Sequence, residues 1–376
     1  MKKIKQTILW SVCCFIGLGF MLEEFEGKHS IQQDVPLFFT MEQEHQQATR
    51  RQEVFRFTGK DTLVEHSVFL LSDEQNKPLL FYSDILTPVC IDNICKPMYI
   101  ELYWNLLGNY VGYDVVEEEP LTKYDHELFE EADYKKLHEL LLDKHSILER
   151  KSLTDLFNNE VEAAQKVTYK GQEVDGFTGA TKKEIKGSVV EGALYSCYAA
   201  WHLVHGVVAQ KMDSVLQRIY STRLEKYMLY SDYEDYRFYA LQQLDTDQFA
   251  RHTDQLFTIF KTGKPIVRSY WLKKVPLSLF ASEDGTNALY EDLESFDINS
   301  RTTLLHKLPE VNETAANLIA QQVALLSRNQ LHIYLNFLEA DTALQTPVVI
   351  EALGEIVAAE TYAYAYLVES FLNKQN

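Results

Sequence analysis

The chain has 376 residues, 46% of them hydrophobic and 12% aromatic, which is enough apolar material for a sizeable core and for two domains. Its 36 basic and 55 acidic residues give a net charge of −19 at pH 7. Because this charge repels phosphate backbones, we expect no nucleic-acid partner.

The first 22 residues have the pattern of a targeting segment. Three lysines precede an uncharged run over residues 7–22, and Glu23 and Glu24 follow it. This order predicts a signal peptide or signal anchor that places the rest of the chain outside the cytosol, in the periplasm or cell envelope. Cleavage, retention as a membrane tether, and a lipid anchor at Cys13 or Cys14 all stay open as alternatives.

Residues 23–51 are polar and rich in glutamine, which predicts a loosely packed lead-in. A strand-rich α+β domain is expected over residues 52–210, with antiparallel hairpins followed by helices. The predicted strands are the short apolar runs 63–71, 79–89, 98–106 and 110–116. A Gly108-Asn109 turn joins the last two as a hairpin.

Cys90 and Cys95 enclose a four-residue loop between two of these runs. Cysteines facing each other across such a loop fit a structural disulfide in an oxidising compartment. The alternative is a redox dithiol, although the pair lacks the C-x-x-C spacing linked to a reactive thiol. Cys197 is then left without a predicted partner.

A glycine-containing turn over residues 174–180 runs into an apolar stripe of helical spacing. Gly176 and Gly179 permit positive φ, and Thr181 stands at the N-cap of a helix predicted to continue through Val204. The first amides of such a helix would also accept a phosphate. The same residues form a capping box between Thr181 and Glu184, a feature found in proteins of every function.

The run Asp175-Gly-Phe-Thr178-Gly179-Ala180-Thr181 resembles the flavin-attachment motif of the FMN-binding domain family. In that family, which includes the covalent-FMN subunits of sodium-pumping NADH:quinone oxidoreductase, a flavin transferase esterifies the last threonine with the phosphate of FMN. The resemblance implies covalent FMN on Thr181. The family has Ser or Thr after the acceptor, where this chain has Lys182.

The resemblance extends over residues 80–205 and includes the strand, Gly-Asn turn and strand of residues 99–116. In the family this hairpin precedes the loop that lies over the isoalloxazine ring, which here is residues 117–127. His126 of this loop is a candidate flavin contact, and a solvent-facing histidine is the alternative. A helix is predicted over residues 130–143, and its His138-Glu139 pair lacks the second histidine of a zinc-protease helix, so no metal site is predicted.

Residues 211–376 predict an all-α domain built from repeats. Leu241-Gln-Gln-Leu244, Leu272-Lys-Lys-Val275, Leu305-His-Lys-Leu308 and Leu335-Asn-Phe-Leu338 recur at intervals of 31, 33 and 30 residues. Paired helices at this interval predict an α-solenoid that resembles HEAT-like arrays, with an irregular helical bundle as the alternative. A tyrosine-rich segment, residues 227–239, is either an interaction face or interhelical packing.

We therefore expect an exported electron-transfer flavoprotein, with FMN on Thr181 and a helical repeat that docks it to a redox partner protein. Turnover of a small substrate is not implied, because no nucleophile elbow or phosphate-binding loop is present in the sequence. One alternative is a non-redox extracytoplasmic scaffold with a degenerate FMN-binding fold. A dithiol enzyme that uses Cys90 and Cys95 is another.

Overall fold

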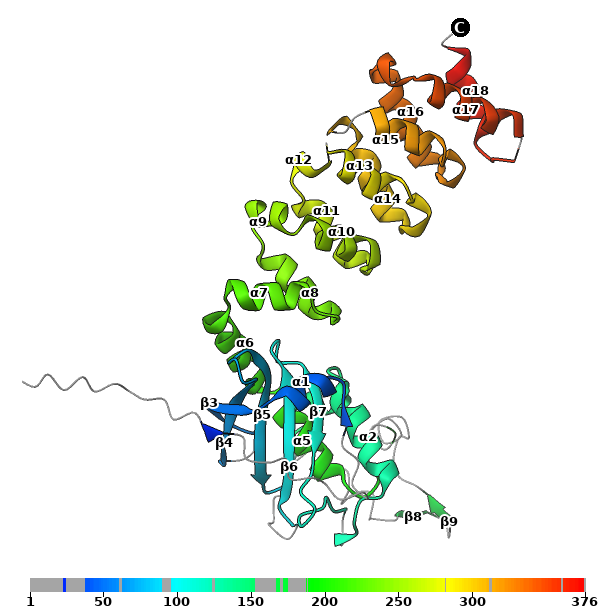
Figure 1. Cartoon of the computed structure of the whole chain (residues 1–376). Coiled ribbons are helices and arrows are strands. Elements are labelled where there is room, and N and C mark those ends of the chain that lie inside the picture. The colour runs from blue at the N-terminus through cyan, green and yellow to red at the C-terminus, as the bar shows by residue number, and fades with distance from the viewer. Residues whose placement is uncertain are drawn as a thin grey trace, which may run out of the picture. The chain divides into compact units, whose positions relative to one another are not determined.

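The computed structural model describes residues 23–24, 38–60, 63–89, 96–123, 126–152, 167–169, 172–174, 187, 189–280, 282–310, 313–359 and 361–374. The chain divides into two compact units, residues 1–220 and 221–376. The first unit combines an antiparallel sheet with helices, and the second is helical over its described residues (Figure 1). The coarse prediction of a strand-rich domain followed by a helical one is therefore confirmed.

Over the described residues of the first unit, seven strands form one antiparallel sheet in the order β1-β3-β4-β5-β6-β7-β2. Their bounds are β1 Glu23–Glu24, β2 Phe38–Phe39, β3 Arg50–Thr58, β4 Glu65–Ser72, β5 Pro78–Thr87, β6 Met98–Asn105 and β7 Tyr110–Asp114. The four predicted strand runs are confirmed as β4 to β7. A smaller hairpin pairs β8 (Val167–Tyr169) with β9 (Gln172–Val174).

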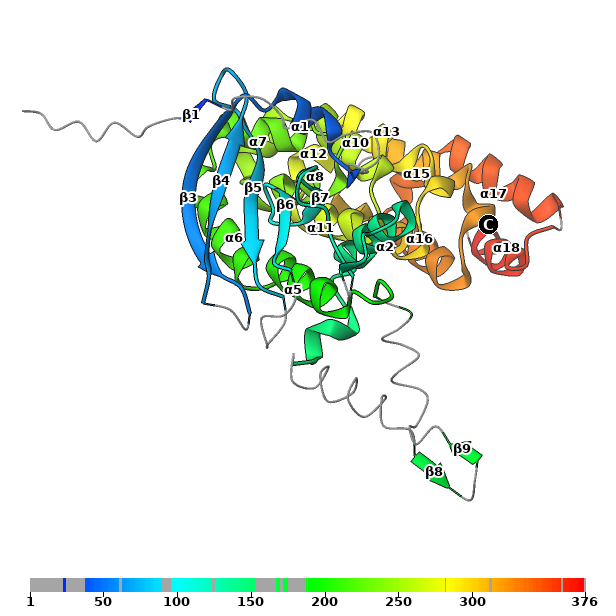
Figure 2. The same cartoon turned by 90° about the horizontal axis from the view of Figure 1, so that it is seen from below.

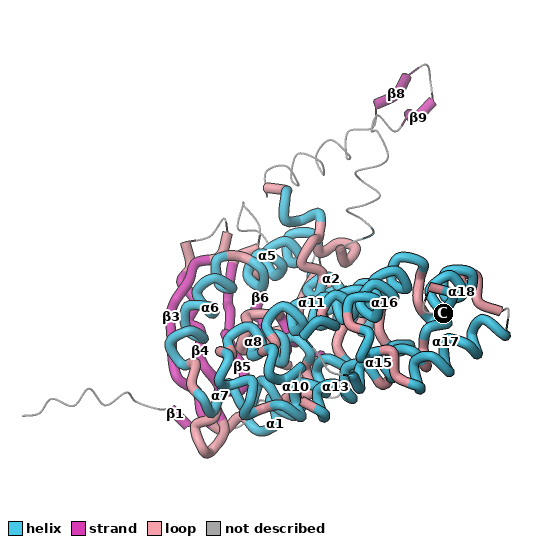
Figure 3. The backbone as a smooth tube through the Cα atoms, turned by 90° about the horizontal axis from the view of Figure 1, so that it is seen from above, coloured by secondary structure: helices cyan, strands magenta, loops and turns pink. Residues whose placement is uncertain are grey.

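Helices α2 (Glu131–Leu142), α5 (Leu194–His205) and α6 (Val207–Ile219) pack on the main sheet, and α5 and α6 cover one of its faces (Figure 3). Alternate strand residues point into this layer because successive side chains of a strand point to opposite faces. Phe81, Ile100 and Trp104 of this face are fully buried. Trp104 also donates from Nε1 to the carbonyl oxygen of Val204 at 3.0 Å, which ties α5 to the sheet.

The predicted hairpin between β6 and β7 is confirmed. Gly108 has φ +74°, a conformation that favours glycine, and its amide donates to the carbonyl of Asn105 at 2.9 Å. The side-chain oxygen of Asn105 accepts from the amides of Leu107 and Asn109 at 2.9 and 3.0 Å. A Cβ on Gly108 would lie 3.4 Å from Cβ of Met212, so the turn also fits closely against α6.

The prediction of a loosely packed lead-in is wrong for residues 38–51. Phe38 and Phe39 form β2, which pairs with Tyr113 and Gly112 at the edge of the sheet. Helix α1 (Glu42–Gln47) follows and packs on the opposite face from α5, where the buried ring of His45 lies 4.9 Å from that of Tyr103. Two adjacent phenylalanines in a polar stretch were the available signal, because aromatic residues favour strands.

The sequence predicts a boundary between the two units after residue 210, which lies inside α6. In the structure the boundary follows residue 220, just after the end of that helix. The reason is that α6 packs on β3, where the ammonium of Lys211 donates to the carbonyl of Arg56, so the whole helix belongs to the sheet unit.

Over the described residues of the second unit, five helix pairs follow one another. They are α7 (Thr222–Leu229) with α8 (Glu234–Gln243), α10 (Thr253–Thr262) with α11 (Pro265–Lys274), α13 (Glu283–Tyr290) with α14 (Ile298–His306), α15 (Glu313–Ala320) with α16 (Arg328–Ala340), and α17 (Pro347–Ala359) with α18 (Ala365–Asn373). Two short helices, α9 (Thr246–Arg251) and α12 (Leu277–Phe280), lie in the connections.

The pairs stack in two layers. First helices α13, α15 and α17 pack side by side, and so do second helices α11, α14 and α16 (Figure 1 and Figure 2). The repeated Leu-x-x-Leu residues lie on the second helices or at their ends, and all eight apolar side chains are buried. This repeated motif is therefore part of the buried core stripe in four of the five pairs, as its periodicity predicted.

Buried and half-buried polar side chains join successive pairs. Gln330 of α16, 1% exposed, donates from Nε2 to the carbonyl of Ile298 and to the hydroxyl of Thr302 in α14, both at 3.0 Å. Arg268 of α11 donates to the Asp297 carboxylate at 3.2 Å, and Asp297 caps the N-terminus of α14. Each such bond satisfies a group that would otherwise be costly to bury.

No helix within the described parts of the chain is long and apolar enough to cross a membrane.

We expect Gln330→Ala to lower the free energy of unfolding by about 2 to 3 kcal/mol, because it removes two bonds to α14 and the Gln330 half of the capping box with Ser327. Urea unfolding followed by circular dichroism measures the change. Asn329→Ala, at the exposed neighbouring position, is the control and should stay within about 0.5 kcal/mol of the unmodified chain. Equal effects of the two substitutions would contradict this account of the interface.

Candidate functional site

The predicted attachment residues lie outside the part of the chain that the structure describes, namely Asp175, Gly176, Thr178, Gly179, Ala180 and Thr181. The same holds for Cys90 and Cys95. Both flanks of the attachment motif are described. On the N-terminal side β9 runs to Val174, the residue directly before Asp175, and it is held in register by pairing with Val167 of β8.

On the C-terminal side, the prediction of one continuous helix from Thr181 to Val204 is wrong. Residues 189–193 form a turn, in which the Ala193 amide donates to the Val190 carbonyl at 3.1 Å, and α5 begins only at Leu194. Gly192 in this turn has φ +76°, a conformation that interrupts a helix. The apolar spacing misled because Val189 and Ala193 are buried within the turn itself.

The loop that precedes α2, residues 117–129, folds back on itself. The amide of Lys123 donates to the Glu127 carbonyl at 2.7 Å, and that of Phe129 donates to the Leu121 carbonyl at 3.0 Å. Buried Leu121 and Phe129 anchor the two arms. His126 lies at the tip with φ +63° and an exposed side chain, so the structure places its imidazole in solvent.

This loop and the segment after the attachment motif lie together. A Cβ built on Gly192 would lie 3.4 Å from Cβ of Lys123, so backbone and side chain are in close contact. The Lys123 ammonium lies 2.6 Å from the Asp133 carboxylate in the first turn of α2, and this hydrogen bond raises the pKa of Lys123. Loop, helix end and downstream flank of the motif thus form one continuous piece of structure.

The N-terminus of α2 is not a free anion site. The carboxylate of Asp133 accepts from the Glu130 amide at 2.9 Å, and the Glu130 side chain accepts from the N3 backbone amide in return. Since these carboxylates already occupy the first-turn amides, a phosphate would have to displace them.

Four residues of α5 pack within the first unit and contact neighbouring segments, namely Cys197, Trp201, His202 and His205. Burial raises the pKa of the Cys197 thiol to about 12, and its sulfur accepts from the Val190 amide at 3.4 Å. Trp201 donates to the Asp143 carbonyl at 2.8 Å. His205 lies 2.8 Å from the Leu141 carbonyl, and burial lowers the pKa of its imidazole. Helix α5 therefore ties the end of α2 to the sheet unit.

Among the described residues, no group of three or more His, Cys, Asp or Glu side chains could hold a metal ion.

Sequence reasoning missed an acidic row across the centre of the sheet. Asp84 of β5 lies opposite Glu101 of β6, which lies opposite Asp114 of β7. Glu101 accepts from the hydroxyls of Tyr82 and Tyr103 at 3.0 and 3.1 Å, and burial raises the pKa of Asp84. Strand register alone produces the row, so only knowledge of the pairing could have found it.

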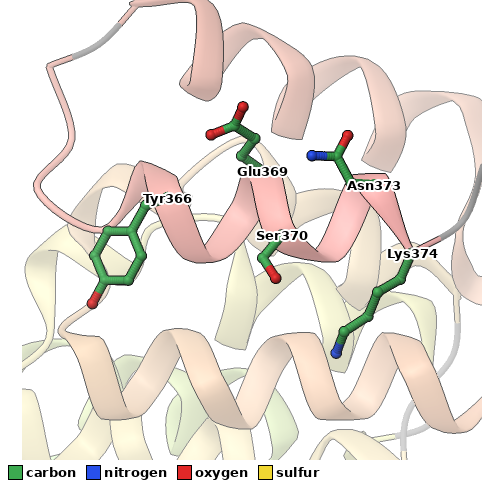
Figure 4. A pocket seen from close by; sticks show the side chains of 5 residues that line it. All are labelled: Tyr366, Glu369, Ser370, Asn373 and Lys374. Carbon is green, nitrogen blue, oxygen red and sulfur yellow. The ribbon is translucent and has the colours of Figure 1, made fainter.

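In the helical unit, a shallow pocket of about 500 Å³ lies along α18. Its lining residues are Tyr366, Glu369, Ser370, Asn373 and Lys374 (Figure 4). Lys374 also lies 3.1 Å from the Glu339 carboxylate at the end of α16. The pocket is polar and open, which suits a surface contact more than an enclosed small molecule.

The tyrosine-rich segment over residues 227–239 contributes to packing between α7 and α8. Tyr236 is fully buried, and its ring lies 6.1 Å from that of Tyr227 and 5.8 Å from that of Tyr233. Tyr230 is 49% exposed, so the segment also leaves aromatic surface in solvent.

Comparison with known proteins finds no match: no family model, no curated protein and no solved structure is similar to this chain.

We expect the Cys197 thiol to resist alkylation by iodoacetamide in the folded chain at pH 8, because a thiol with a pKa of about 12 is protonated there and is also buried. Peptide-resolved mass spectrometry measures labelling with and without denaturant, and the denatured chain is the positive control. Rapid labelling of Cys197 in the native chain would contradict its assignment as a packing residue.

We also expect Asp84→Asn to stabilise the sheet unit at pH 7 by about 0.5 to 1 kcal/mol, because the ionised carboxylate is partly desolvated and lies opposite Glu101. A raised folded-state pKa gives stability that is present at low pH and lost as pH rises through it, so the difference should shrink towards pH 4. Urea unfolding at several pH values measures this, with exposed Glu74→Gln as control. A gain that grows on acidification would refute the sign.

Proposed function

We propose that the protein is an exported flavoprotein that carries FMN through a phosphoester on Thr181 and exchanges electrons with a partner redox protein. The observation that carries the proposal is the run Asp175 to Thr181, with the acceptor threonine and the Thr178-Gly179-Ala180 residues at matching positions. A capping box alone requires only Thr181 and Glu184, so it does not account for the other matches.

The described residues that follow the motif support this proposal. The turn at Gly192 packs on Lys123 of the loop of residues 117–127, the loop which in the family lies over the flavin ring. The turn that follows the motif therefore packs on the sheet unit next to this loop. Such anchoring suits a group that must be held at one position and orientation.

The flavin, when attached, would supply one- or two-electron transfer, and the chain would supply attachment and orientation. The Thr181 hydroxyl would provide the ester oxygen. Lys123 is engaged with Asp133 and so fixes the loop rather than meeting the flavin. The exposed imidazole of His126 is available at the loop tip for a hydrogen bond to a reduced ring.

Localisation and partners follow from the same proposal. Flavin transferases of this type act outside the cytosol, which agrees with the basic-then-apolar pattern of residues 1–22. The stacked helix pairs of the second unit are proposed to be a HEAT-like solenoid that docks the flavin unit to its redox partner. Pairs that contact mainly their neighbours offer an extended surface for this purpose.

A second candidate is a non-redox extracytoplasmic scaffold with the same fold. Lys182 favours it, because the attachment motif has Ser or Thr at that position. In this case the turn before Lys182 would act only as a helix cap, and the helical unit would carry the function.

The test is co-expression with a flavin transferase in an exported form, followed by peptide mass measurement. We expect an FMN-phosphate adduct on the Thr181 peptide, its loss in Thr181→Ala, and equal or higher occupancy in Lys182→Thr. Thr303→Ala, in the helical unit, controls for expression and export. Absence of the adduct in both the unmodified chain and Lys182→Thr would favour the scaffold, and an adduct that persists in Thr181→Ala would exclude the assigned residue.

A further inference from the structure

Four successive second helices present the same outward pattern. On each of these helices, four residues at positions i, i+3, i+4 and i+7 lie on the side away from the core. None of their side chains is buried. We call this set the second-helix face, and its members are Asp235, Phe238, Tyr239 and Gln242 of α8, Ile266, Ser269, Tyr270 and Lys273 of α11, Asn299, Thr302, Thr303 and His306 of α14, and Asn329, His332, Ile333 and Asn336 of α16.

The face is nearly free of charge, although it belongs to an acidic chain. Asp235 and Lys273 are the only Asp, Glu, Lys or Arg residues among its positions, whereas the chain as a whole has a net charge of −19. An outward helix face is usually rich in charged residues. Amides, hydroxyls and aromatic rings stand here instead, and these are the groups that pair with an uncharged partner.

The polar half of the face lies on α14 and α16. The side chains of Asn299, Asn329 and Asn336 are exposed, so their amides are accessible to a partner. An amide offers two donors and one acceptor, so one side chain can pair with both the N–H and the C=O of a peptide unit. Asn299 and Asn329 occupy equivalent positions on neighbouring helices, so such pairs can repeat from one helix to the next.

The apolar half lies on α8 and α11. The rings of Phe238 and Tyr270 meet edge to face with centroids 5.6 Å apart and bridge the two helices. Ile266 beside them is 65% exposed. Aromatic and aliphatic groups of this kind are typical anchors of protein interfaces, so one end of the face favours apolar side chains.

We propose that the second-helix face binds an extended, uncharged segment of a partner polypeptide, whose apolar residues lie over α8 and α11. Packed helices lie about 8–10 Å apart, and an extended chain advances about 3.3 Å per residue. A segment of roughly 10–12 residues therefore crosses the four helices and meets one amide or hydroxyl for every two or three of its residues.

The small number of basic residues on this face argues against two other classes of partner, nucleic acids and phosphopeptides. A nucleic acid needs several Lys or Arg contacts to its phosphates, and a phosphopeptide needs an arginine cluster. Lys273 is the one Lys or Arg residue among the positions of the face, which leaves both classes without their main contacts. The inference goes beyond the proposed flavin role, and it holds whether or not Thr181 carries FMN.

The experiment selects binders from displayed random peptides of about 12 residues against the full chain. We expect enriched peptides to be uncharged, with aromatic or aliphatic residues gathered at one end. Fluorescence anisotropy then compares the unmodified chain with the double variant Asn329→Asp, Asn336→Asp, which keeps the side-chain shape but loses four donors. Affinity should fall at least tenfold.

Gln321→Glu makes the same amide-to-acid change at an exposed position beside α15, in the other layer, and should leave affinity unchanged. Circular dichroism and melting temperature confirm that every variant folds. Enrichment of charged peptides, equal affinity of the double variant and the unmodified chain, or comparable binding of a single-stranded oligonucleotide would each overturn the proposal. Repeating the binding in Thr181→Ala separates this result from the flavin question, because the affinity should not change there.

Discussion

The first unit depends on helix α5. This helix packs on the sheet and makes hydrogen bonds to three other segments of the unit. Its Val204 carbonyl receives the indole of Trp104 at 3.0 Å, while Trp201 donates to the backbone just past α2. Its Cys197 thiol accepts from Val190 in the turn after the attachment motif. Since buried backbone groups must find partners, one helix that serves three segments sets where each of them lies.

Much of this architecture was readable from local patterns. Alternating apolar runs predicted β4 to β7, a Gly-Asn pair predicted the turn at Gly108, and the recurring Leu-x-x-Leu residues predicted the buried stripe of the helical unit. Sequence periodicity gave wrong predictions at two places, a turn with helical apolar spacing and a very short strand. Val189 and Ala193 keep helical spacing across a turn that Gly192 interrupts, and Phe38-Phe39 is too short a strand to show alternation. The acidic row depends on pairing between strands, which no single segment encodes.

The sequence identifies the residues of the candidate motif, but it does not identify the tertiary contacts beside that motif. The residues Asp175 to Thr181 stand out in the sequence, whereas the contact between Gly192 and Lys123 joins positions about 70 residues apart and follows from tertiary packing. The two proposed activities occupy different units. One needs a fixed hydroxyl beside an ordered loop, and the other needs a repeated uncharged face, so each can be lost by substitution without loss of the other.

The neighbour-to-neighbour stacking of the helix pairs has a kinetic consequence. Hydrogen bonds between successive helix pairs of the second unit join residues about 30 positions apart, as from Gln330 to Ile298 and from Arg268 to Asp297, whereas the sheet pairs Phe38 with Tyr113 and α5 lies against a strand about 100 residues upstream. Chains with low contact order fold faster, because less loop entropy is lost before the first rewarding contact. During refolding the helical unit should thus reach its native fold before the sheet unit does. Residues 221–376 would then be compact while the sheet unit is still unfolded.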